Sequence, residues 1–525
     1  MSTPRFPLTF EPSGVTVWVE HGTTVLEAAR RAGVIVPAPC GGRGTCGKCA
    51  VRIIDGDPEP PDEFEKVGLA RAPQGLRLAC RARIRGPLTV RPLIAGAVTS
   101  EQAHGPVEDD ALLAAVDLGT TTVAALIVGA QSGRELGRAT VPNAQQSFGG
   151  DVVSRISAAL SGHADELKQA AQASVLEALH AACGAAGACL ERTQRVVVAG
   201  NTAMTALLAG VDVTSLATAP YEVPHGVFGP LDAPVLAAAL AQGAHLETLP
   251  GLGGFVGGDT TAGLLSSGLL SLDAGAAFVD IGTNAEIVVV GKGRAAYASA
   301  AAGPAFEGFG LTSGGLAVEG AIVAVRAADD LSVEVLGGGS PQWIAGSGAL
   351  SAIAALRATG HLDETGLFSA VGPYASRFDT DEAGVVRVGL GPEGGPPFLT
   401  QLDVRAFQTA KAAVAAGLLS VTRAAGLKPR HIGRVVVGGS FGSALDGEDL
   451  VSLGVLPVDV RERIESAGDV ALAGAAVAAF DPTALSELAD FRRGAVRVEL
   501  AADAGFSEMF ARATALREYT FKRGF

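Results

Sequence analysis

The stretch Cys40-Gly-Gly-Arg-Gly-Thr-Cys46-Gly-Lys-Cys49 brings three thiols within ten residues, and Cys80 follows in Arg-Leu-Ala-Cys-Arg. This C-x5-C-x2-C spacing lets a loop wrap a small inorganic cluster while one distant thiol completes the ligand set. Glycines suit such a loop because they adopt positive φ angles and bring backbone N–H groups close to sulfur. A zinc site or a disulfide set is the alternative, but zinc sites usually pair two C-x2-C units, and only one is present. We therefore expect Cys40, Cys46, Cys49 and Cys80 to bind an iron–sulfur cluster.

The surrounding residues predict a small fold around this loop. Residues 6–20 alternate in hydrophobicity, which predicts a β-hairpin turning at 12–14. Thr24 and Glu27 have the spacing of a capping box, and Gly33 is a stop signal, so a helix is expected between them. Strands are expected at 50–54 and 81–90. This order resembles plant- or vertebrate-type 2Fe-2S ferredoxins over about residues 5–92, and the x5 gap leans toward the adrenodoxin-like branch. The resemblance implies a β-grasp domain.

Arginines gather around Cys80. Arg81, Arg83 and Arg85 alternate along the expected strand 81–90 and would share one face of it. One interpretation is an edge strand protected by charge. The other is a docking face for an acidic redox partner. Cys183 and Cys189 have no further cysteine nearby, so we expect buried structural thiols there.

Composition narrows the class of protein. The chain has 525 residues, 48% hydrophobic but only 5% aromatic, which suits α/β domains with small-residue packing. The net charge of −14 argues against a nucleic-acid partner. No stretch resembles a signal peptide or a membrane span, so we expect a cytoplasmic protein that does not bind membranes.

The chain changes character after residue 111. The segment around Asp117-Leu-Gly119-Thr-Thr-Thr122 reads as an apolar strand, a tight turn and a second apolar strand, and Asp280-Ile-Gly282-Thr-Asn284 repeats the pattern. Backbone N–H groups and hydroxyls in such turns can hold phosphate oxygens, and an Asp at the strand end can hold Mg²⁺. Two copies indicate a duplicated domain. We expect a ferredoxin domain at 1–92, a linker at 93–111, a first lobe at 112–262 and a second lobe at 263–525, with the C-terminal segment free to return to the first lobe.

A third element is the strand that ends at Gly438-Gly-Ser-Phe-Gly442. A Gly-Gly turn allows a backbone to approach a ribose or a flat ring closely. No Walker A motif is present, so a P-loop fold is not supported. The two turns and this element together resemble the actin, sugar kinase and Hsp70 ATPase superfamily, in which ATP binds between two lobes.

This second resemblance implies the roles of a set of residues. Asp117, Asp280 and Glu307 are the candidate catalytic residues, of which the two aspartates would position Mg²⁺ and water. The candidate nucleotide-binding residues are Gly119, Thr120, Thr121, Thr122, Gly282, Thr283, Asn284, Gly438, Gly439, Ser440, Phe441 and Gly442. Asp259 and Glu307 both lie in Gly-rich surroundings, and for each of them a role near ATP or Mg²⁺ and a role in capping or turn formation remain open. Catalysis would rest on positioning and charge neutralisation.

The whole chain resembles the reductive activators of corrinoid-dependent methyltransferases. The motifs that carry the resemblance are the four cysteines, the two Asp-Gly-Thr turns, Gly200-Asn-Thr-Ala-Met204, Ala302-Gly-Pro-Ala-Phe-Glu-Gly308, Gly346-Ser-Gly348, Gln408-Thr-Ala-Lys411 and Gly438-Gly-Ser-Phe-Gly442. The resemblance implies ATP-dependent delivery of one electron from a 2Fe-2S cluster, converting Co(II) in a corrinoid protein to Co(I). It also implies an electron donor, either a flavoprotein or a ferredoxin reductase, and leaves a homodimer open.

Two other classes of function remain. The first is a ferredoxin-type electron-transfer oxidoreductase whose two lobes are an ATP-silent scaffold; loss of Asp117 or Asp280 would favour it, and both are present. The second is a small-molecule kinase with a redox-sensing domain, which needs a catalytic aspartate in a substrate cleft. The sequence points to none.

Overall fold

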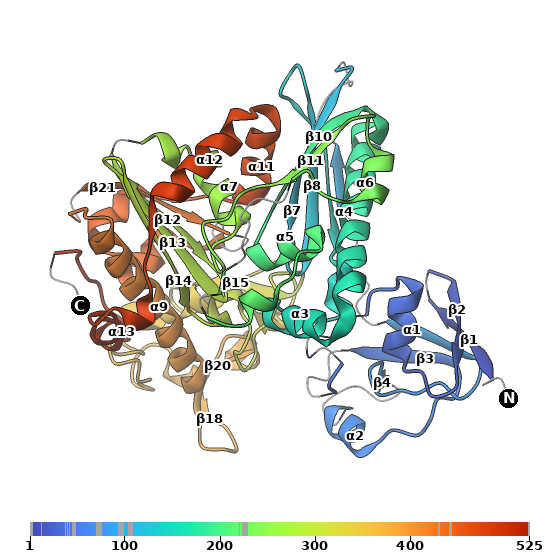
Figure 1. Cartoon of the computed structure of the whole chain (residues 1–525). Helices are drawn as coiled ribbons and strands as arrows, with labels where there is room; N and C mark the ends of the chain where they lie inside the picture. The colour runs from blue at the N-terminus through green and yellow to red at the C-terminus, as the bar shows by residue number, and fades with distance from the viewer. Residues whose placement is uncertain are drawn as a thin grey trace. The chain divides into compact units, whose positions relative to one another are not determined.

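The structure, a computed structural model, describes residues 4–11, 13–36, 38, 40, 42–44, 49–69, 76–92, 99–102, 109–219, 221–222, 229–272, 274–428, 431–439 and 444–522. It divides into two compact units. The first contains Met1–Ala262 and Ala471–Ser486, and the second contains Gly263–Val470 and Glu487–Phe525. A stretch near the C-terminus thus belongs to the first unit. Figure 1 labels the elements along the chain.

The N-terminal part is a five-stranded mixed sheet in the order β2-β1-β5-β3-β4. The helix α1 packs against β1 and β2 of this sheet. The elements are β1 (Arg5–Phe10), β2 (Val15–Glu20), α1 (Val25–Ala32), β3 (Ala50–Gly56), α2 (Glu63–Leu69), β4 (Leu76–Leu78) and β5 (Leu88–Pro92). The predicted hairpin and helix are confirmed: Thr24 and Glu27 form a capping box, and Gly33 closes α1 in the left-handed conformation. Leu8, Phe10 and Val90 fill the core with no exposed surface.

The strand predicted at 81–90 is wrong in its first half. β5 begins only at Leu88, and residues 81–86 form turns with a single bridge between Arg83 and Thr24. The polar alternation that predicted a strand therefore belongs to a loop. Arg81, Arg83 and Arg85 do not share a strand face.

The rest of the first unit is built on a six-stranded sheet in the order β11-β10-β7-β8-β9-β6. The strands are β6 (Thr99–Gln102), β7 (Leu112–Leu118), β8 (Thr122–Gly129), β9 (Glu135–Pro142), β10 (Thr193–Gly200) and β11 (His245–Thr248). Its helices are α3 (Val152–Ala158), α4 (Ala164–Ala186), α5 (Thr202–Ala209), α6 (Pro234–Ala239) and α11 (Val470–Phe480), and α4 packs on β8 and β9. The segment expected as a linker contributes β6, which pairs with β9.

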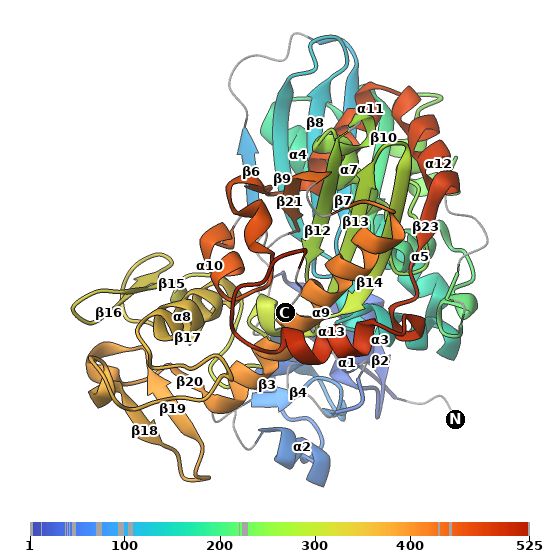
Figure 2. The ribbon, with the colours of Figure 1, turned by 90° about the vertical axis from the view of Figure 1, so that its left-hand side faces the viewer.

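The second unit repeats this sheet in the order β22-β21-β12-β13-β14-β23. Figure 2 labels its strands β21, β12, β13, β14 and β23. The strands are β12 (Gly275–Ile281), β13 (Asn284–Gly291), β14 (Arg294–Ala301), β21 (Ile432–Gly438), β22 (Ile464–Ser466) and β23 (Ala495–Arg497). In both sheets a three-stranded antiparallel meander is extended by two parallel strands. β8 and β13 even share one burial pattern. The predicted duplication is confirmed.

Helices and two small sheets complete the second unit. α9 (Gln401–Ala424) packs on β13 and β14, and α13 (Phe506–Ala513) packs on α9. The remaining elements are β15 (Ala321–Ala327), β16 (Leu331–Val335), β17 (Trp343–Ile344), α8 (Gly346–Ala358), β18 (Phe378–Thr380), β19 (Val386–Gly389), β20 (Phe398–Thr400) and α10 (Gly447–Ser452), with α7 (Gly258–Ser266) and α12 (Thr483–Gly494) at the unit boundaries. Among the described residues, none of the helices has the length and apolarity needed to cross a membrane.

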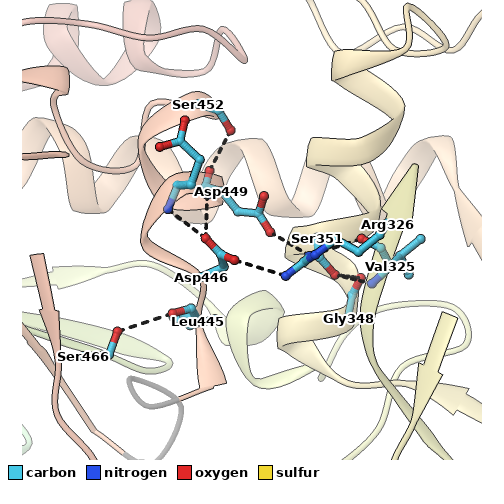
Figure 3. A network of polar contacts seen from close by, with 10 residues as sticks. Val325, Arg326, Gly348, Ser351, Leu445, Asp446, Asp449, Ser452 and Ser466 are labelled. Carbon is cyan, nitrogen blue, oxygen red and sulfur yellow. Dashed lines mark hydrogen bonds and ion pairs between the residues drawn. The ribbon is translucent and has the colours of Figure 1, made fainter. Parts of the chain in front are cut away.

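A polar network ties β15 to α10 in the second unit (Figure 3). Arg326 pairs with Asp446 at 3.1 Å and with Asp449 at 3.4 Å. The Asp449 side chain is only 17% exposed. Burial raises the pKa of Asp449 to about 6, and the nearby charge of Asp446 adds to the increase, while Arg326 opposes it.

We expect Asp449→Asn to stabilise the protein at neutral pH. The unfolded-state pKa of an aspartate is about 3.9, so between about pH 4 and pH 6 the native state binds more protons than the unfolded state. The free energy of unfolding therefore falls as pH rises through this window. Above pH 6 the loss reaches about 3 kcal/mol. Asparagine removes this penalty. Thermal unfolding should show a higher Tm for the variant at pH 7.5 and no gain near pH 4.

Asp379→Asn is a control of opposite sign. A hydrogen bond from Arg387 lowers the pKa of the exposed Asp379. The stabilisation from this pair is present above the unfolded-state pKa of Asp379 and is lost as pH falls. Asp379→Asn should therefore not raise the Tm at pH 7.5. Equal Tm changes at pH 4 and pH 7.5 in Asp449→Asn would contradict the assigned pKa.

Candidate functional site

Three of the four candidate cluster ligands lie in the described residues, and all three are buried. Cys40, Cys49 and Cys80 are 7%, 1% and 8% exposed, and the Sγ atoms of Cys49 and Cys80 lie 3.3 Å apart. Cys46 lies outside the described residues. Gly42 has a φ of +90°, as expected of a glycine-rich cluster loop. The predicted loop thus meets the distant cysteine across the fold.

The donor set suits a thiolate-bound metal centre. Two thiolates on one tetrahedral metal with bonds near 2.3 Å lie about 3.8 Å apart, close to the separation of Cys49 and Cys80. The hydrogen bond between Cys49 and Cys80 lowers the pKa of Cys49 and raises the pKa of Cys80. Cluster loading must therefore release protons. Within the described part of the chain, no three His, Cys, Asp or Glu side chains are grouped so that they could hold a metal ion.

The arginines near Cys80 form ion pairs and hydrogen bonds within the N-terminal domain. Arg77 pairs with the fully buried Glu65 at 2.8 Å, Arg81 lies 3.6 Å from Asp62, and Arg85 pairs with Asp57. Arg83 donates to the carbonyl oxygen of Gly22 at 2.8 Å. The acidic partners compensate much of the positive charge near Cys80. The surface considered as a docking face for an acidic partner is therefore less basic than the sequence suggests.

The first Asp-Gly-Thr turn joins β7 to β8, and its carbonyl oxygens are held by the residues that follow β9. Asn143 donates through Nδ2 to Gly119 at 2.8 Å and through its backbone N–H to Thr121 at 2.9 Å. Gln146 donates through Nε2 to the same Thr121 carbonyl at 2.6 Å. Thr121 and Thr122 are exposed. A Cβ at Gly119 would come within 2.7 Å of the Thr122 carbonyl, so the tight turn requires glycine.

Arg155 supports the same turn from α3 and is fully buried. Its guanidinium donates to the Thr120 carbonyl, to the Gly149 carbonyl at 3.0 Å and to Gln145 Oε1 at 3.2 Å. Burial lowers the pKa of Arg155, and the charge of Asp151 partly opposes this effect. Several carbonyl contacts compensate for the loss of water around the cation. Arg155 thus links the Thr120 carbonyl of the turn to α3.

The second Asp-Gly-Thr turn joins β12 to β13 and is held by different partners. Glu307, at the end of the short helix η6 (Pro304–Glu307), accepts hydrogen bonds on Oε1 from the backbone N–H of Thr283 and from its hydroxyl, the latter at 2.9 Å. The carbonyl of Thr283 accepts from Gly303 at 2.8 Å. Glu307 therefore lies at this turn, where it occupies donors that a phosphate could use. Asn284 is exposed, and Gly282 is half-buried.

Asp280 lies where three elements meet. It is half-buried at the end of β12, faces Glu286 across β13 and is in parallel register with Gly438 of β21. Gly439 has a φ of +89°, and a Cβ there would come within 2.1 Å of Asp280 Oδ1. The structure thus brings the Gly-Gly element against the second turn. Ser440, Phe441 and Gly442 lie outside the described residues.

Asp117 is the counterpart of Asp280 at the end of β7, where it pairs in register with Ala199 of β10. Asn201 follows β10, caps α5 and reaches the hydroxyl of Thr120 at 3.4 Å. Burial raises the pKa of Asp259 at the start of α7, although a hydrogen bond from the backbone N–H of Thr260 opposes this. Asp259 is a further candidate acid.

The side chains that contact the turns were not predicted from the sequence. Asn143, Gln146, Arg155 and Glu286 had been given no role. Their one signal is a run of amides directly after an apolar strand, followed by an arginine in a helix that is otherwise small and apolar. Of the two remaining cysteines, Cys183 is buried as expected, but Cys189 is exposed, which contradicts that prediction.

Comparisons with known proteins place these sites in a family. Residues 275–523 match the C-terminal domain of RACo, the ASKHA domain, and residues 112–271 match the RACo middle region. Corrinoid activation enzyme RamQ of Eubacterium limosum is 32% identical over 413 residues, which cover 75% of this chain and 69% of RamQ. The chain belongs to the RACo family.

The other matches extend the likeness over the RACo-type chain from end to end. A solved structure of a reductive activator for corrinoid, iron-sulfur protein covers 97% of this chain and 98% of its own, with a TM-score of 0.67 and 26% identity. Residues 8–85 match the 2Fe-2S iron-sulfur cluster binding domain. Over 51 residues the chain is also 49% identical to phenol hydroxylase P5 protein of Acinetobacter pittii (strain PHEA-2), or 10% of this chain and 14% of that protein. The predicted combination of a ferredoxin domain and an actin-like ATPase fold is confirmed.

Proposed function

We propose that this protein reduces the cobalt of a corrinoid protein from Co(II) to Co(I) with one electron and couples this step to ATP hydrolysis. The observation that carries the proposal is the end-to-end likeness to a reductive activator for corrinoid, iron-sulfur protein. RamQ, a corrinoid activation enzyme, supports it. A 2Fe-2S cluster bound by the cysteines supplies one-electron transfer. The electron donor would be a flavoprotein or a ferredoxin reductase.

Energetics explain why such a reduction needs ATP. For transfer of one electron from the cluster to cobalt, each 59 mV by which the cobalt potential lies below the cluster potential reduces the equilibrium constant about tenfold. This corresponds to about 1.4 kcal/mol. A nucleotide-bound state that binds the corrinoid protein and removes a cobalt ligand would make reduction easier. Hydrolysis would then release the partner.

We assign the nucleotide to the two Asp-Gly-Thr turns. Asp117 and Asp280 are proposed to hold Mg²⁺ and the attacking water, since both carboxylates end a buried strand directly before a turn. Thr120, Thr121 and Thr122 of the first turn and Thr283 of the second are proposed to hold phosphate oxygens. Glu307 would have to leave Thr283 before a phosphate takes its donors. No covalent nucleophile is required.

The test combines the purified protein, a Co(II) corrinoid protein, a reductant and MgATP, with the cobalt spectrum as the readout. We expect Co(I) to form only with ATP, and ATP turnover to rise when the corrinoid protein is added. ATP turnover that does not respond to the corrinoid protein would contradict the coupling. Equal Co(I) formation with and without ATP would instead favour a ferredoxin-type oxidoreductase with an ATP-silent scaffold.

A further inference from the structure

The first nucleotide turn and the cluster loop are joined by a short chain of contacts within the first unit. This series of contacts begins at the carbonyl oxygen of Thr121, which accepts a hydrogen bond from Gln146 Nε2 at 2.6 Å. Gln146 lies in the one-turn helix η1 (Ala144–Ser147), whose cap is Asn143. Asn143 donates to the same carbonyl at 2.9 Å. Two hydrogen bonds therefore join η1 to the carbonyl of the nucleotide turn.

The other side of η1 contacts the segment that leads into the cluster loop. The backbone carbonyl of Gln146 accepts a hydrogen bond from the N–H of Ala38 at 3.0 Å. Ala38 is fully buried and lies two residues before Cys40. A single residue, Gln146, thus binds the nucleotide turn with its side chain and the cluster-loop segment with its backbone.

A second connection runs through α1. Arg30 donates through Nε to the carbonyl of Ser147 at 2.8 Å, and its guanidinium carbon lies 4.5 Å from the centre of the Phe148 ring. At the other end of the helix, the backbone N–H of Leu26 donates to the carbonyl of Ala79, next to Cys80, at 2.9 Å. The Leu26 side chain also packs against Gly42 of the cluster loop. α1 therefore contacts η1 and both segments that carry cluster cysteines.

We propose that Gln146 and Arg30 are positioning residues that couple nucleotide binding at the first turn to the redox state of the cluster. The proposal rests on the proposed function, since it presumes that a nucleotide binds these turns. Coupling between two sites is reciprocal: if nucleotide changes the cluster's midpoint potential, reduction must change nucleotide affinity by the same free energy. A tenfold ratio of dissociation constants corresponds to a 59 mV shift for one electron.

The experiment measures both sides of this relation on the full-length, cluster-loaded protein. The dissociation constant of a non-hydrolysable ATP analogue is determined for the oxidised and the dithionite-reduced protein, and the midpoint potential is determined with and without the analogue. We expect the two dissociation constants to differ at least threefold, with a potential shift that matches the ratio. Gln146→Leu and Arg30→Met should each bring the ratio closer to one, because each removes one of the parallel connections. Each variant is compared with its own oxidised form, so a general change in affinity cancels.

Arg31→Met is the matched control, because Arg31 is the exposed neighbour of Arg30 on α1; its ratio should equal that of the wild type. A wild-type ratio of one would overturn the inference, and so would an unchanged ratio in both Gln146→Leu and Arg30→Met. In either case ATP-dependent Co(I) formation would still stand. Absence of any nucleotide binding would contradict the proposed function as well. If one variant fails to fold, the other decides.

Discussion

Cys80→Ser is expected to abolish cluster binding while the nucleotide-binding lobes remain folded. Cys80 is buried beside Cys49, with 3.3 Å between the two sulfur atoms, and the backbone around it joins β4 to α1. Serine is close in size, so the apolar core should survive. Its hydroxyl is a much poorer ligand for iron than a thiolate, because thiolates are the ligands that iron–sulfur clusters use.

Iron and sulfide content, with the visible spectrum, check this expectation. The wild type should contain about two iron atoms per chain, and the variant almost none. Cys183→Ser is the matched control, since Cys183 is also buried but lies on α4, away from the cluster loop. ATP turnover without a corrinoid protein should persist in both variants. A full iron content and an unchanged spectrum in Cys80→Ser would show that Cys80 is not a ligand. Cys46→Ser tests the fourth predicted ligand in the same way.

The parts of the fold that could be predicted are those in which local sequence and final environment agree. Both Asp-Gly-Thr turns are flanked by apolar strands, and those strands are buried in the centres of two equivalent sheets. The capping box at Thr24 and Glu27 is satisfied within four residues. Such features need no knowledge of distant chain segments, so hydrophobic pattern and capping chemistry identify them.

The features that were missed depend on partners far along the chain. β6 is an edge strand of four residues that is defined by its pairing with β9. Arg81 and Arg85 alternate as strand residues would, but acidic side chains from the 57–62 segment draw them into a loop. Glu307 contacts Thr283 from 24 residues away. None of these pairings leaves a periodic signal in the sequence.

The proposed nucleotide site shows the same division. Asp280 and Gly439 were both predicted to lie at the site, but only the parallel pairing of β12 with β21 brings them into contact. Asn143, Gln146 and Arg155 hold the first turn through its carbonyl oxygens, a role that any side chain of sufficient length with an N–H or O–H donor could have filled. Residue type alone therefore could not identify them.

Asp280→Asn is expected to lower ATP turnover by about 100-fold or more, the usual cost of removing one preorganised charge-stabilising group. Asparagine has the same shape, so the close contact with Gly439 and the register with Glu286 are preserved. The change removes one negative charge at the place where we propose Mg²⁺ to bind. Without that charge the metal is held less tightly, and the turnover that remains should need a higher Mg²⁺ concentration.

Nucleotide binding without Mg²⁺ separates this role from a structural one. A carboxylate close to a triphosphate repels it when no cation lies between them, so Asp280→Asn should bind metal-free ATP analogue as tightly as the wild type or more tightly. Damage to the turn would weaken binding with and without Mg²⁺ and would lower the Tm. Asp117→Asn, at the equivalent place in the first lobe, is the matched comparison. An Asp280→Asn protein with wild-type turnover and an unchanged Mg²⁺ requirement would exclude Asp280 as the metal ligand, and a loss confined to Asp117→Asn would assign that role to the first lobe.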